Sequence, residues 1–142
     1  MTDFNFHIPQ PFDQQVADEG VDFEFFDKNK VHWGTFKCLY LDANSRKIKL
    51  AQDRIKQKYA RELRLGTEDN EAIGLELFLD AILVAWSEVK DGKGKEVPYS
   101  KEAAEAYFAN PTVRAFVLPY LLEAVQDYRN FQKVSAGAIS GN

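Results

Sequence analysis

The apolar run between residues 73 and 86 constrains the fold more than any other feature, because only two charged side chains interrupt it. Those two, Glu76 and Asp80, stand four residues apart, which is the spacing of one helical face. The pattern therefore predicts a helix over about 67–87, capped by Thr67 and polar along one narrow face. Such an apolar helix either lies in the centre of a core or is buried at a subunit interface.

Self-association follows from the size of the chain. With 142 residues the protein forms one domain, which offers few elements to surround so apolar a helix. We therefore expect a homo-oligomer. The candidate surface for self-association or client binding combines apolar residues of this helix with basic residues of the preceding one: Leu77, Phe78, Leu79, Ile82, Trp86, Arg54, Lys58 and Arg61.

Charge is unevenly distributed along the chain. Residues 46–65 carry eight Lys and Arg against two acids, and residues 66–91 carry seven acids against one Lys. This contrast predicts two helices that pair as an antiparallel hairpin or present opposite charges to partners. We interpret Glu76 and Asp80 as a polar seam paired with basic residues of the preceding helix, and favour this over an acid–base or divalent-ion site.

The N-terminal quarter predicts a small hairpin. Residues 1–20 contain Pro9, Pro11 and isolated aromatics, so we expect irregular structure. Alternation of apolar and polar residues predicts strands over 21–26 and about 32–41, joined by a turn at 27–30. An isolated hairpin is marginal in water, so it should pack on the helices or pair with another subunit.

Helix signals divide the rest of the chain. Asp42, Asn44 or Ser45 can cap a helix that ends at Gly66. Ser100 caps a short helix ending near Ala109, and a last helix runs from Pro111 toward Phe131 with a kink at Pro119. The segment between these helices and the apolar one is a charged, glycine-bearing hinge. We therefore predict a mainly α fold with a small N-terminal β-hairpin (α+β) and about four helices. The domain spans 21–134, and a flexible tail follows at 135–142.

No catalytic, cofactor-binding or metal-binding set emerges. Cys38 and His32 stand six residues apart on one predicted strand, too far to touch, and no metal-ligand spacing of His is present. Gly92 to Lys95 lacks the spacing of a phosphate loop and follows a predicted helix. We expect a protein that is not an enzyme. The single cysteine indicates a reducing compartment, and neither a signal-like N-terminus nor a membrane-spanning run stands out.

The residues from Trp86 to Phe131 occur in a familiar order. They comprise a tryptophan that ends an apolar segment, a valine, an Asp-Gly turn, Pro-Tyr-Ser and a final Asn-Phe, with signature positions Trp86, Val89, Gly92, Pro98, Tyr99, Asn130 and Phe131. This order, with the upstream basic helix, resembles the tail assembly chaperones of long-tailed (siphovirus-like) bacteriophages. The resemblance covers about residues 46–131.

The resemblance implies a function in assembly. Such chaperones bind and solubilise the tape-measure protein, help recruit tail-tube subunits, act in the host cytoplasm and are absent from the mature virion. A longer frameshifted form would begin in the tail near Ser135. Two alternatives stay open: a structural or tail-completion protein of the phage tail, and a nucleic-acid-binding module that uses the basic helix 46–65.

Overall fold

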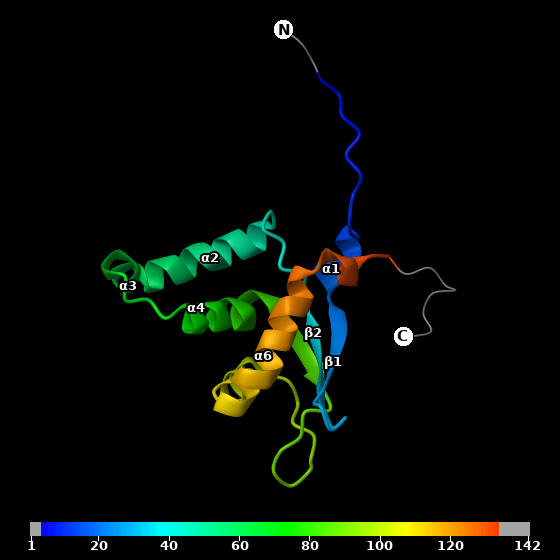
Figure 1. Ribbon diagram of the computed structural model, residues 1–142, viewed down its shortest axis with the longest axis vertical. Helices are drawn as coiled ribbons and strands as arrows, with labels where there is room; N and C mark the ends of the chain where they lie inside the picture. Colours follow the sequence, from blue (N-terminus) through cyan, green and yellow to red (C-terminus); the bar gives the residue numbers. More distant parts are fainter. Residues whose placement is uncertain (1–3, 134–142) are drawn as a thin grey trace.

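The computed structural model describes residues 4–133 and shows an α+β fold, which confirms the predicted class (Figure 1). A helical hairpin projects sideways from a small sheet. The predicted tail at 135–142 lies outside the described residues. In chain order the elements are α1 (Gln14–Glu19), β1 (Val21–Phe26), β2 (His32–Cys38), α2 (Arg46–Lys58), α3 (Ala60–Leu65), α4 (Asn70–Leu77), the π-helical turn η1 (Phe78–Ile82), β3 (Leu83–Ser87), α5 (Lys101–Phe108), α6 (Pro111–Gln126) and the 3-10 turn η2 (Tyr128–Phe131).

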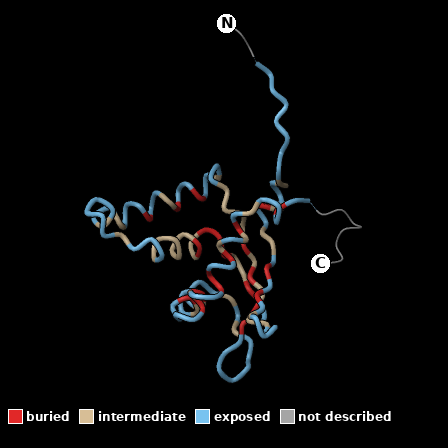
Figure 2. Tube along the Cα trace, in the orientation of Figure 1, coloured by how far each residue is buried: buried red, intermediate tan, exposed pale blue. Residues whose placement is uncertain are grey.

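The sheet is antiparallel with strand order β1-β2-β3. Its inner face carries Phe23, Phe25 and Phe36, and α5 and α6 cover that face. Figure 2 shows the buried residues concentrated in the sheet and along one side of α6. The largest fully buried side chains come from β2, η1, α5, α6 and η2, and they make one core: Phe36, Phe78, Phe108, Phe131, Ile82 and Leu121.

The prediction of one apolar helix over about 67–87 is wrong in its second half. The α-helix ends at Leu77, one π-helical turn follows, and residues 83–87 form strand β3. The outer edge of β2 needs a hydrogen-bonding partner, and β3 supplies it with Trp86 opposite Phe36. A continuous apolar run fits a buried strand as well as a buried helix, so periodicity alone did not distinguish them.

Local chemistry explains the N-terminal half of the fold. Residues 14–19, expected to be irregular, form α1 because the Asp13 carboxylate accepts the backbone N–H groups of Gln15 and Val16. Both strands of the predicted hairpin are confirmed, although β2 ends at Cys38.

The predicted basic helix is present but divides at Tyr59 into α2 and α3. Of its three possible caps, Ser45 is used, and Gly66 ends α3 in the left-handed conformation (φ 72°). The cap of α4 is Asp69 rather than Thr67.

The C-terminal helices begin where predicted. Ser100 caps α5, and Asn110 caps α6 with Pro111 at its first position. Pro119 lies inside a continuous α6, and its ring leaves the Ala115 carbonyl without a helical donor on an exposed face. The helix ends at Gln126 and does not reach Phe131. Among residues 4–133, no helix is both long and apolar enough to cross a membrane.

Candidate functional site

An ion-pair seam joins α2 to α4 and η1, as predicted for Glu76 and Asp80. The Asp80 carboxylate contacts Arg54 at 2.5 Å and Lys101 at 3.1 Å. Glu76 accepts hydrogen bonds from Lys58 Nζ at 2.7 Å and from the Tyr59 hydroxyl at 2.5 Å. The seam lines a groove of about 290 Å³ between α2, α4, η1 and α5.

Both carboxylates of the seam are held in the charged form. The hydrogen bond from Arg54, followed by that from Lys101, lowers the pKa of Asp80 below its usual value. Burial by itself raises the pKa of Glu76, but the hydrogen bonds from Lys58 and Tyr59 together outweigh burial and lower it. A general acid or base works best with a pKa near neutrality, so this arrangement fits a role in holding the hairpin together.

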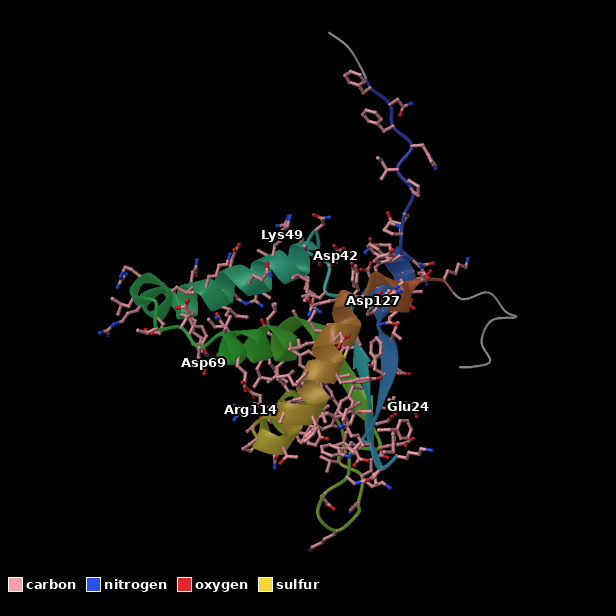
Figure 3. The ribbon with its side chains drawn as sticks, viewed as in Figure 1. Glu24, Asp42, Lys49, Asp69, Arg114 and Asp127 are labelled. Carbon is pink, nitrogen blue, oxygen red and sulfur yellow. The ribbon has the colours of Figure 1, made fainter. Side chains whose placement is uncertain are left out.

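The exposed surface of α2 and α3 outside the seam is a second surface, which we call the basic face. Lys49 lies on it in Figure 3. Its cationic side chains are all exposed, and in the described part of the chain none is within ion-pair distance of a carboxylate: Arg46, Lys47, Lys49, Lys56, Arg61 and Arg64. Leu50, Leu63 and Leu65 add exposed apolar area to the same two helices.

A third surface is an aromatic groove of about 460 Å³ between the β1–β2 turn and the start of α6. Phe26 and Phe116 line it with 50% and 58% of their surface exposed. Trp33 also lines it, and its indole N–H donates to Asp27 at 3.0 Å. This hydrogen bond is the main reason why the pKa of Asp27 is lowered. No motif in the sequence indicated this groove, because Phe26 and Phe116 are far apart in the chain and only the fold brings them together.

Three of the five apolar residues proposed for self-association are in the core. Phe78, Ile82 and Trp86 are 0%, 1% and 9% exposed, because η1 and β3 turn them toward α5 and the sheet rather than toward a subunit surface. Leu77 and Leu79 stay partly exposed. The basic residues proposed for the same surface lie in two places: Arg54 and Lys58 belong to the seam, and Arg61 belongs to the basic face.

Most signature positions from Trp86 to Phe131 have structural contacts. The Trp86 indole donates to the Val97 carbonyl at 2.8 Å and packs on Tyr99 with ring centroids 5.5 Å apart. The Asn130 amide donates to the Ala124 carbonyl at 2.9 Å near the end of α6. The remaining positions divide into the buried Val89 and Phe131 and the exposed Gly92 and Pro98.

The segment between β3 and α5 is not a hinge between helices. It is a loop whose two sides are joined by an isolated bridge from Lys90 to Glu96. Asp91 accepts the backbone N–H groups of Lys93 and Lys95 at the tip of the loop.

Cys38 and His32, which were considered as a catalytic pair, lie apart in the structure. Burial raises the pKa of the Cys38 thiol strongly, which makes it a poor nucleophile. His32 lies at the other end of β2, between Glu24 and Glu88 at 3.7 and 3.1 Å. Among residues 4–133, no group of three or more His, Cys, Asp or Glu is placed to hold a metal ion.

Comparison with known families matches residues 41–142 to the YdaY prophage protein family. The chain belongs to that family. The match spans more than two thirds of the chain and includes the helical hairpin, the aromatic Phe116 and the whole Trp86–Phe131 signature. No curated protein and no solved structure matches the chain. The protein is therefore phage-derived, and its role is phage-related.

Proposed function

We propose that this chain is a phage tail assembly chaperone, which binds and solubilises the tape-measure protein and helps to recruit tail-tube subunits. It acts as a homo-oligomer in the host cytoplasm and is absent from the mature virion. Membership of a prophage family supports this proposal, as does the resemblance of residues 46–131 to such chaperones. In this role the protein carries out no reaction of its own.

The observation that carries the proposal is the exposed aromatic groove. Phe26 and Phe116 expose half or more of their surface, and clustered exposed apolar surface typically marks a binding site. A long helical client presents apolar residues at i, i+3, i+4 and i+7, and such a stripe fits a groove of this kind. The groove therefore serves as the client site.

Co-expression with the tape-measure protein of the same prophage tests the proposal. The wild-type chain should keep the client soluble and co-purify with it. Phe26→Ser combined with Phe116→Ser should abolish capture, because both side chains line the groove. The control Tyr128→Ser changes an aromatic side chain that is 42% exposed in η2, outside the groove, and should capture normally.

Two results would contradict the proposal. One is a tape-measure protein that is equally insoluble with and without the chain. The other is recovery of the chain from purified virions at a fixed copy number, which would indicate a structural or tail-completion protein.

A further inference from the structure

The basic face carries few acids of its own, since only Asp53 and Glu62 lie on α2 and α3, and neither forms an ion pair in the described structure. The acids of α4 and η1 that the sequence places next to it, Glu76 and Asp80, are already occupied by Arg54, Lys58 and Lys101 in the seam. Six exposed cations and three exposed leucines therefore stay without partners among residues 4–133. A surface with apolar residues among charged ones has the composition of a protein-binding surface.

The N-terminal segment has the complementary composition. Residues 1–27 contain seven acids and no Lys or Arg. Four of these carboxylates are exposed on α1 and β1: Asp18, Glu19, Asp22 and Glu24. Lys37 is the cross-strand neighbour of Asp22, but it makes no ion pair with it in the described structure. The same segment begins with an extended arm that exposes Phe4, Phe6 and Ile8 by 73%, 71% and 78%.

Most of the basic face lies away from the N-terminal segment, although Asp18 of α1 and Lys47 of α2 line the same pocket. In Figure 1 α2 and α3 project to one side of the sheet, while β1 is its strand on the opposite side. Figure 3 shows the same separation between Lys49 and Glu24. Within one copy, no cation of the basic face forms an ion pair with a carboxylate of the N-terminal segment in the described structure.

We propose that the basic face of one copy binds the N-terminal segment, residues 4–24, of a second copy. Carboxylates of α1 and β1 pair with the cations of α2 and α3, and the apolar side chains of the arm cover the exposed leucines. Because each copy uses two different surfaces, the interface is head-to-tail and generates a ring or a filament rather than a two-fold dimer. The inference rests on the proposed function for its biological role, since it names the surfaces through which the chaperone self-associates.

A second copy fits the basic face better than a nucleic acid does. The whole chain carries a net charge of −4, which gives no general attraction to nucleic acid. On α2 and α3 the exposed apolar side chains are leucines, which offer no stacking surface for bases. The apolar side chains of the N-terminal arm can cover the leucines, and the carboxylates of α1 and β1 can pair with the cations.

Complementary half-interfaces test the inference. One variant neutralises the basic face by Lys49→Gln, Lys56→Gln and Arg61→Gln, and the other neutralises the N-terminal segment by Asp18→Asn, Asp22→Asn and Glu24→Gln. All six residues are exposed, so both variants should melt near the wild-type temperature. Nucleic-acid-free samples are measured by sedimentation velocity in about 50 mM and about 500 mM salt.

The wild-type chain should form species larger than a dimer at low salt, and its apparent Kd should weaken by about tenfold or more at high salt. Each variant alone should sediment as a monomer. Their equimolar mixture should give a one-to-one heterodimer that grows no further, because it contains a single intact interface. The control Lys90→Gln, Lys93→Gln and Lys95→Gln removes three cations from the exposed loop and should assemble like the wild type.

Several results would overturn the inference: a monomeric wild type at low salt, variants that assemble normally, or a mixture that forms no heterodimer. A monomeric wild type whose basic face binds a DNA duplex in a salt-dependent way would assign that face to nucleic acid. Tape-measure capture by a chain that does not assemble would reject this inference and the homo-oligomer, and would leave client binding by the aromatic groove standing. Normal assembly without tape-measure capture would support this inference and reject the proposed function.

Discussion

At the scale of single residues, Trp86 joins three parts of the core. Its ring meets Phe36 of β2 and Tyr107 of α5 edge-on, and its indole N–H donates to the Val97 carbonyl at 2.8 Å. We predict that Trp86→Ala lowers the free energy of unfolding by about 3–5 kcal/mol, since it leaves a cavity and removes this hydrogen bond. Urea denaturation followed by circular dichroism measures the change.

Lys93 is the matched comparison because it is exposed at the tip of the loop that follows β3. Lys93→Ala should change the free energy of unfolding by less than about 0.5 kcal/mol. If Lys93→Ala proved the more damaging of the two, the loop rather than the tryptophan would hold this region together.

At the scale of elements, the sequence predicted several helix ends that local chemistry decides, although it missed the Asp13 cap of α1 and named Thr67 where Asp69 caps α4. Ser45, Gly66 and the Asn110-Pro111 pair mark helix ends through their own side chains and backbone preferences, and the structure uses each of them. Strand β3 depends on something non-local, the open edge of β2. Its residues could not reveal that edge, because a run such as Leu83 to Trp86 suits a buried helix and a buried strand equally.

The seam between α2 and η1 makes a prediction about pH. The pKa of Asp80 is lowered by Arg54 and Lys101 in the folded state, so its ionisation stabilises the fold above the ordinary carboxyl pKa. That contribution is lost as the pH falls through the lowered value. We predict that Asp80→Asn lowers the free energy of unfolding by about 1 kcal/mol at about pH 7, and that the difference from wild type narrows toward about pH 3.

Urea titrations at several pH values measure this narrowing. Glu123→Gln is the control, because Glu123 is exposed on α6 and forms no ion pair in the described structure. That variant should follow the wild type at every pH. A constant difference for Asp80→Asn across the range would show that the seam stabilises the hairpin by packing and not by charge.

At the scale of the whole molecule, the candidate surfaces depend on which side of each helix the fold exposes. The sequence separated charged from apolar stretches correctly. It could not show that Phe78 and Ile82 face α5 and the sheet, or that Phe116 lies outside the core. Those assignments follow from the packing of α5 and α6 on the inner face of the sheet, which is set by contacts between residues far apart in the chain.

The same packing predicts uneven local stability. The helices α3 and α4 contribute no buried residue, and α2 contributes Ile48, Ala51 and Ile55, the last of which lies outside the main core cluster. By contrast, α6 buries five residues. Because local opening is easiest where few apolar side chains are buried, amides of α2, α3 and α4 should exchange with deuterium well before those of α6 and the sheet. Hydrogen-exchange mass spectrometry at low protein concentration measures this order. At a concentration where copies assemble, the amides of α2 and α3 should become selectively protected from exchange. Uniform exchange across the chain would mean that the hairpin and the sheet unfold as a single unit.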